Sequence, residues 1–197
     1  DPGQQAVENW GVIGGGGYKA VGVGGSLTGH PADLLIIDDP LKDHAEASSP
    51  AARERVWEWF LSVAFTRLSA EAPIIIIMTR WHVDDLVGRL LDKDRQKQIQ
   101  EAGGTDEQWQ VINLPALAYA NDPMGRPKGA ALYPEKFSER RLQAIKAVLG
   151  SYMWAALYDG NPVRKGGNYI AVDKLVIRSP NEVPPGLRWV RFWDLAT

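Results

Sequence analysis

The stretch Leu34-Leu35-Ile36-Ile37-Asp38-Asp39-Pro40 decides the fold class of this 197-residue chain. Four consecutive apolar residues between aspartates are typical of a strand buried on both faces, as in a parallel sheet. A second apolar run, Ile74 to Met78, follows Pro73 and is rich in β-branched residues, which favour strands. The sequence therefore predicts an α/β fold: a parallel sheet that contains both runs and is flanked by helices.

A helix is predicted between these two strands. Ser49 suits its N-terminal cap and Pro50 its first turn, and the helix is expected to continue to about Ser69. Several apolar side chains recur at the spacing of one helical face, which is expected to pack against the core. They are Val56, Trp59, Phe60 and Val63.

Further elements are expected after the second strand. A helix from about Asp84 to Leu91 begins on an acidic pair, which suits a helix N-terminus. A third strand is predicted at Trp109 to Leu114, and helices at residues 137–149 and 150–158. Strands that alternate with helices indicate a parallel sheet with right-handed crossovers.

Composition excludes several classes of protein. The chain is 45% apolar and 23% charged, which is ordinary for a folded domain. It has no cysteine, which excludes a disulfide scaffold, a zinc finger and a thiol nucleophile. Its apolar runs, such as Ile74 to Met78, are far shorter than the about 20 residues that span a bilayer, so no membrane partner is expected. The net charge of -2 requires no nucleic acid, but it allows a local basic patch.

The acids after the first strand carry the main chemical signal. In open α/β sheets, ligands bind at the carboxyl ends of the strands, where Asp38 and Asp39 are expected. This is a Walker B pattern, in which the first acid, Asp38, binds magnesium. The second acid, Asp39, would orient and deprotonate the attacking water, although glutamate is commoner at this position. The alternative is a buried strand that runs into a polar turn.

The second strand ends in Thr79 and Arg80, which are expected at the same edge. Thr79 could hydrogen-bond the attacking water or a phosphate. Arg80 could sense the γ-phosphate or couple hydrolysis to movement. The alternative is an arginine that pairs with Asp84 or Asp85. His82, which follows an indole, is interpreted as structural.

Two glycine-rich segments are interpreted as turns. Gly24 to Gly29 has the spacing of a phosphate loop, but His30 and Pro31 follow it in place of lysine and serine or threonine. The run Gly14 to Gly17 is also followed by the wrong residues. A short strand is predicted between them, at Lys19 to Gly24. No phosphate loop is therefore expected within the 197 residues.

Taken together, several segments resemble the large subunit of phage terminases. The resemblance extends from near residue 10 to the last residue and implies an N-terminal ATPase with a P-loop core, followed by a nuclease with an RNase H-like fold. The matching segments are Ala20–Gly29, Asp33–Pro40, Thr79–His82, Asp84–Leu86 and Phe192–Ala196.

The resemblance also implies roles for individual residues. Asp38 is then the magnesium ligand of an ATP site, Asp39 its catalytic carboxylate, and Thr79-Arg80 a sensing or coupling motif. Asp194 is the first metal ligand of the nuclease, which cuts DNA with magnesium ions. The implied cofactors are ATP and Mg²⁺.

By the same resemblance, the chain is expected to be an internal fragment of the large subunit. Residues 1–161 would be the ATPase domain without its Walker A segment, 162–186 a linker, and 187–197 the first strand of the nuclease domain. The whole protein would pump double-stranded DNA into procapsids as a homo-oligomeric ring in the host cytoplasm, cut concatemers, and bind the portal protein and the small terminase subunit. The fragment alone is expected to be inactive.

Two other interpretations stay open from the sequence. A helicase-like ATPase has the same acids at its strand ends, but it should show further helicase motifs after the third strand, and none is found. A non-catalytic, degenerate prophage remnant would keep the fold without the activity.

Overall fold

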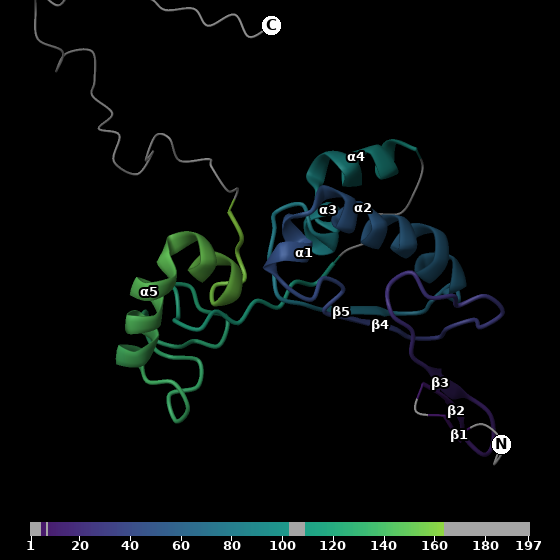
Figure 1. Cartoon of the computed structure of the whole chain (residues 1–197), viewed down its shortest axis with the longest axis horizontal. Helices are drawn as coiled ribbons and strands as arrows, with labels where there is room; N and C mark the ends of the chain where they lie inside the picture. Colours follow the sequence, from purple (N-terminus) through teal and green to yellow (C-terminus); the bar gives the residue numbers. More distant parts are fainter. Residues whose placement is uncertain (1–4, 7, 103–108, 164–197) are drawn as a thin grey trace, which may run out of the picture. The chain divides into compact units, whose positions relative to one another are not determined.

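A computed structural model describes residues 5–6, 8–102 and 109–163 of the chain, drawn in colour in Figure 1. These residues form a mixed α/β structure, as the sequence predicts. The predicted linker beyond residue 163, the strand expected at 187–193 and Asp194 lie outside the described residues. No helix in the described part of the chain is long and apolar enough to cross a bilayer.

The centre of the fold is a pair of parallel strands. Strand β4 spans Leu35–Asp38 and β5 spans Ile74–Ile77, and their register runs from Leu35 opposite Ile74 to Asp38 opposite Ile77. The pairing continues one residue further, because Asp39 N donates to Ile77 O at 2.9 Å. The predicted parallel pairing of the two apolar runs is confirmed.

Only one face of this sheet is covered within the described residues. On that face Ile37 is 5% exposed, and Ile74 and Ile76 pack against the same core. On the other face Ile36 and Ile77 are 54% and 57% exposed. The prediction that the first strand is buried on both faces is therefore wrong for the described chain, because the helices that pack on β4 and β5 lie on a single side of them (Figure 1).

The helical layer begins directly after β4. Helix α1 spans His44–Ser48, and α2 spans Pro50–Trp59, where the Ser49 hydroxyl accepts a hydrogen bond from Ala52 N at 3.3 Å. The chain then continues as a π-helical turn, Phe60–Ala64, and a 3₁₀ turn, Phe65–Arg67. The predicted helix from Ser49 to about Ser69 is thus confirmed, with a change in winding at Phe60. Its predicted core residues Val56, Trp59 and Phe60 are buried, and Val63 packs against them.

Two shorter helices follow β5. Helix α3 spans Leu86–Leu90 and begins two residues later than predicted, because Asp85 caps it from outside the helix. Helix α4, Lys93–Glu101, was not predicted, because its sequence KDRQKQIQE contains a single apolar residue and shows no hydrophobic periodicity. The helix is held against α2 by a cation–π contact, in which the Arg95 guanidinium lies 4.0 Å from the centre of the Trp57 ring.

A second core forms around the last described helix. Helix α5 spans Glu139–Leu157 and is interrupted at Gly150, which has φ 72° and ψ 169°, so the two predicted helical segments meet at a kink. The side chains of Leu142 and Trp154 pack with Leu117 and Ala131 from the preceding loop. We call residues 113–163 the α5 module.

The predicted third strand at Trp109–Leu114 is wrong. The segment has no strand pairing, and Val111 and Ile112 are 59% and 75% exposed. Its polar groups instead meet the end of α5, where Asn113 Nδ2 donates to Asp159 O at 2.9 Å. This segment has strand propensity, but it forms contacts with the C-terminal end of α5 and no strand.

The glycine-rich segments are turns, as predicted. Strands β1 (Gln5–Ala6), β2 (Asn9–Gly11) and β3 (Gly17–Lys19) form an antiparallel sheet, and Gly14 to Gly16 make the β2–β3 turn with positive φ. The short strand predicted at Lys19–Gly24 is wrong beyond Lys19. Gly25 N donates to Gly22 O at 2.8 Å, which closes a turn within that segment.

We expect Phe60→Ala to lower the free energy of unfolding by about 3–5 kcal/mol, because the side chain is 2% exposed and its removal leaves a cavity. Leu61→Ala is the matched control, since Leu61 is 41% exposed and its loss should cost about 0.5 kcal/mol or less. Chemical denaturation followed by tryptophan fluorescence measures both. Equal losses for the two variants would contradict this description of the core.

Candidate functional site

The two parallel strands bring the predicted site residues to one edge. Asp38 is the last residue of β4, and Thr79 follows the end of β5 by two residues. Because β4 and β5 are parallel neighbours, both residues lie at the carboxyl edge of the sheet, which confirms the predicted placement. This edge is called the acidic edge below.

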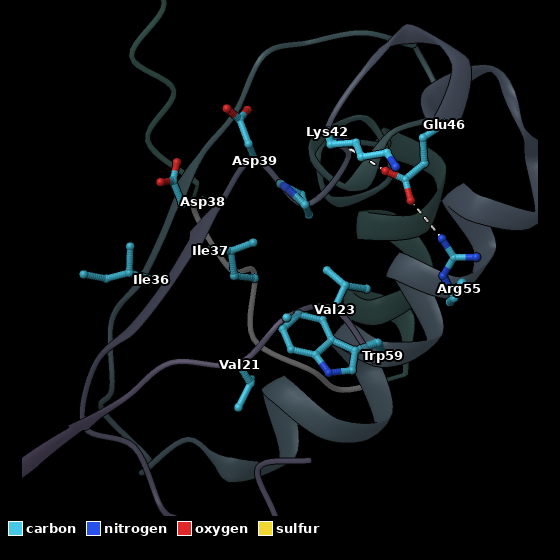
Figure 2. Close-up of a pocket in the computed structure, with 12 residues that line it drawn as sticks. Val21, Val23, Ile36, Ile37, Asp38, Asp39, Lys42, Glu46, Arg55 and Trp59 are labelled. Atoms are coloured by element: carbon cyan, nitrogen blue, oxygen red, sulfur yellow. Dashed lines mark hydrogen bonds and ion pairs between the residues drawn. The ribbon is translucent and has the colours of Figure 1, made fainter. Parts of the chain in front are cut away.

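A cavity of about 350 Å³ opens beside the acidic edge. Figure 2 shows Asp38 and Asp39 at one end of it, with Ile37, Val23 and Trp59 forming an apolar floor. The Trp59 indole is fixed by its hydrogen bond to Gly25 O at 3.1 Å, so the glycine-rich turn and α2 close this side together. The other lining residues are Val21, Gly22, Ile36, Pro40, Lys42, Glu46 and Arg55.

Asp39 has an unusual backbone conformation. With a φ of 39°, Asp39 is the only non-glycine residue among the described residues that has a positive φ. Aspartate tolerates this conformation better than most residues, but it still stores strain, and such strain concentrates at functional sites. Two hydrogen bonds hold it: Asp39 N donates to Ile77 O at 2.9 Å, and its Oδ1 accepts from Thr79 N at 2.9 Å. The carboxylate thus ties the ends of β4 and β5 together.

The carboxylates at this edge have the donor chemistry of a magnesium site. Both Asp38 and Asp39 are exposed, and within the described residues Oδ2 of Asp39 accepts no hydrogen bond. No three His, Asp or Glu side chains of the described residues form a complete metal cluster. Magnesium does not need one, because it usually binds through one or two carboxylates together with substrate phosphates and water. Asp38 and Asp39 therefore fit the ion in combination with a phosphate ligand.

Charged residues of α1 and α2 form the side wall of the cavity. Glu46 accepts a hydrogen bond from Lys42 N at 3.1 Å and pairs with Arg55 at 2.9 Å (Figure 2). The Arg55 side chain is 57% exposed, so the pair is well solvated and contributes little to stability. These residues were not predicted from the sequence, although Asp43-x-x-Glu46 has the spacing of a helix cap with a glutamate in the first turn.

Arg80 is anchored to the start of α3. Its Nε donates to both oxygens of Asp85, at 3.0 and 2.8 Å, and Asp85 is fully buried. The same carboxylate accepts a hydrogen bond from Gly88 N at 2.8 Å. A Cβ at Gly88 would clash with Val83 O, so only glycine allows this close approach. The alternative in which Arg80 pairs with Asp85 is thus the arrangement found.

A second ion-pair group joins α2 to α3. Asp84 accepts from Arg89 Nε at 2.8 Å and from Arg53 Nε at 3.0 Å. The hydrogen bond from Arg89 holds the pKa of the Asp84 carboxyl below its ordinary value; burial opposes this, and Arg53 adds to the lowering. Because the pKa is lowered in the folded state, the stabilisation is present above the ordinary aspartate pKa and is lost as the pH falls through the lowered value.

His82 lies in the turn between these two groups. Its Nδ1 accepts a hydrogen bond from Asp84 N at 3.0 Å. This contact is local to the loop that leads into α3, and it places the ring among the residues that position the helix.

The described residues form an α/β protein with an acidic edge on two parallel strands. The family model described as "Terminase large subunit, T4likevirus-type, N-terminal" matches residues 2–177. The chain therefore belongs to the family of phage terminase large subunits, as its sequence motifs indicate, and the family implies a role in packaging phage DNA. No curated protein matches the chain.

We expect Asp85→Ala to lower the free energy of unfolding by about 3 kcal/mol, because it removes a helix cap and leaves the Arg80 guanidinium without its buried partner. Asp92→Ala is the matched control: Asp92 caps α4 in the same way, through Arg95 N, but it is exposed and pairs with no arginine side chain of the described residues. Its loss should cost about 1 kcal/mol. Urea denaturation of both variants measures the difference, and equal costs would show that the Arg80–Asp85 pair does not hold α3.

Proposed function

We propose that the acidic edge binds ATP with magnesium and hydrolyses it to drive double-stranded DNA into a procapsid. The observation that carries this proposal is the meeting of Asp38, Asp39 and Thr79 at the carboxyl edge of two parallel strands. Family membership supports the packaging role. The proposed reaction is phosphoryl transfer from ATP to water, which depends mainly on positioning of the reactants and neutralisation of charge.

The two acids have separate tasks in this proposal. Asp38, exposed at the end of β4, would hold the magnesium ion, which neutralises charge on the phosphates when it is bound. Asp39 would orient the attacking water and accept its proton. Its Oδ1 accepts the hydrogen bond from Thr79 N, so Oδ2 is the oxygen that would accept the proton of the water. The hydrogen bond from Thr79 fixes the carboxylate, which is what a general base requires.

Arg80 and Thr79 complete the edge. Thr79 follows β5 and donates its backbone N–H to Asp39, and in this proposal its hydroxyl would bind a water or a phosphate. Arg80 is held through Nε by a fully buried carboxylate, which favours coupling of the edge to α3 over free reach toward a phosphate. We therefore assign Arg80 the coupling role of its two proposed roles.

The rest of the proposed function rests on the family and on the sequence. The family resemblance makes Asp194 the first metal ligand of an RNase H-like nuclease that cleaves concatemers, together with further acids, since two metal ions need several carboxylates. The proposed partners are double-stranded DNA, the portal protein, the small terminase subunit and further copies of the protein in a ring. The proposed location is the host cytoplasm.

We expect Asp39→Asn to reduce ATP hydrolysis by about 10²–10⁴-fold in the complete large subunit, with nucleotide binding preserved, because the amide cannot accept the proton of the water. The amide oxygen still accepts the hydrogen bond from Thr79 N, so the edge keeps its shape. Asp194→Asn in the same protein should leave hydrolysis near normal and stop DNA cleavage.

Steady-state phosphate release and plasmid nicking, measured on the same preparations, separate the two sites. Residues 1–197 alone, in which the sequence predicts no phosphate loop, are expected to give the background for phosphate release. If Asp194→Asn stopped hydrolysis while Asp39→Asn stopped only cleavage, the two assignments would be reversed.

A further inference from the structure

An aromatic contact joins the two cores of the described chain. The ring of His44, the first residue of α1, lies 6.0 Å from the ring of Tyr152 at an interplanar angle of 89°. The same His44 ring lies 6.3 Å from the ring of Trp81 at 66°. Both are edge-to-face arrangements, which aromatic rings favour over stacked sandwiches. His44 therefore contacts the segment after β5 on one side and the α5 module on the other.

This contact continues back to the acidic edge through short links. Asp39 Oδ1 accepts from Thr79 N at 2.9 Å, and Trp81 N donates to Thr79 O at 3.0 Å. Thr79 is thus held by the proposed catalytic carboxylate on one side and by the Trp81 backbone on the other. The resulting sequence of contacts is Asp39, Thr79, Trp81, His44 and Tyr152, which we call the aromatic path.

We propose that the aromatic path couples the acidic edge to the α5 module, so that the state of the edge sets the position of α5. This inference rests on the proposed function, and it names the residues through which hydrolysis would be connected to movement. His44 and Tyr152 are positioning residues in this scheme, because they touch neither the carboxylates nor the reacting water.

The start of the path has the features of a switch. Asp39 is held at φ 39°, a strained conformation for a residue with a side chain, and its carboxylate is shared between Thr79 N and whatever binds at the edge. A ligand that draws Oδ1 away from Thr79 N removes the hydrogen bond that fixes the residue after β5. The Trp81 backbone is hydrogen-bonded to Thr79 and would move with it, and the Trp81 ring is in edge-to-face contact with the ring of His44.

The end of the path has a hinge. Gly150 interrupts α5 with φ 72° and ψ 169°, two residues before Tyr152. Glycine adopts this conformation without the penalty of a side chain, and kinks of this kind absorb rigid movements of helix segments. The half of α5 that carries Tyr152 also carries Trp154, whose ring stacks on Tyr158 at 4.6 Å. A displacement at Tyr152 would therefore move a packed segment and not a single side chain.

The test measures coupling separately from hydrolysis in the complete, packaging-competent large subunit. Tyr152→Ala and His44→Ala each remove the aromatic contact from one side, and Tyr152→Phe keeps the ring. Tyr133→Ala is the matched control, since Tyr133 lies in the α5 module with its side chain 57% exposed and outside the path. The measurement is the number of base pairs packaged for each ATP hydrolysed.

We expect both alanine variants to hydrolyse ATP within about twofold of the unmodified protein while the base pairs packaged per ATP fall by about threefold to tenfold, which is the range expected for residues that carry coupling. Tyr152→Phe and Tyr133→Ala should keep the unmodified ratio. Circular dichroism checks that each variant is folded. If Tyr152→Ala does not fold, His44→Ala gives the deciding measurement, because it removes the same aromatic contact from the side of α1.

The path is overturned if folded alanine variants package DNA at the unmodified ratio, or if Tyr152→Phe loses coupling as fully as Tyr152→Ala. It is also overturned if hydrolysis and packaging fall together, which indicates a structural role at the acidic edge. Failure of the proposed function looks different, because the unmodified protein itself would then show no ATP-dependent packaging.

Discussion

The parallel register of β4 and β5 is the constraint on which the rest of the structure depends. Leu35 opposite Ile74 at one end places Asp38 opposite Ile77 at the other, so both strands end at the same edge. A shift of β5 by one residue against β4 would turn Ile74 and Ile76 away from the core and move the end of β5 relative to Asp38 and Asp39. The burial of these side chains against α2 therefore also fixes the chemistry of the edge.

The charged residues around α3 fix the segment that follows β5 at this edge. Buried ion pairs often add little net stability, because removing the charges from water is costly. Here the buried Asp85 both caps α3 and fixes Arg80, which is the residue directly after Thr79. Its main consequence is geometric: the loop between β5 and α3 has one arrangement, and Trp81 within it lies against His44. The stability of α3 and the proposed coupling thus depend on the same short loop.

The sequence predicted the elements whose signals are local. The two apolar runs, the cap at Ser49 and the division of the last helical segment between residues 149 and 150 all follow from neighbouring residues. The prediction was wrong where contacts between residues distant in the sequence determine the structure. Trp109–Leu114 has strand propensity, but Asn113 hydrogen-bonds to the end of α5. At the site, the carboxylates after β4 were found from their position alone. The Asp39–Thr79 hydrogen bond and the His44 contacts depend on the tertiary fold, and no sequence spacing reveals them.

The central claim is that the acidic edge binds a metal–nucleotide complex, and metal-directed cleavage tests it most directly. Fe²⁺ replaces Mg²⁺ in the complete large subunit with a non-hydrolysable ATP analogue, and peroxide with ascorbate then generates hydroxyl radicals that cut the backbone close to the metal. The account predicts nucleotide-dependent cuts near both Asp38 and Thr79, because these residues lie at neighbouring strand ends. Nucleotide-dependent cuts confined to other parts of the chain, with both strand ends intact, would contradict it.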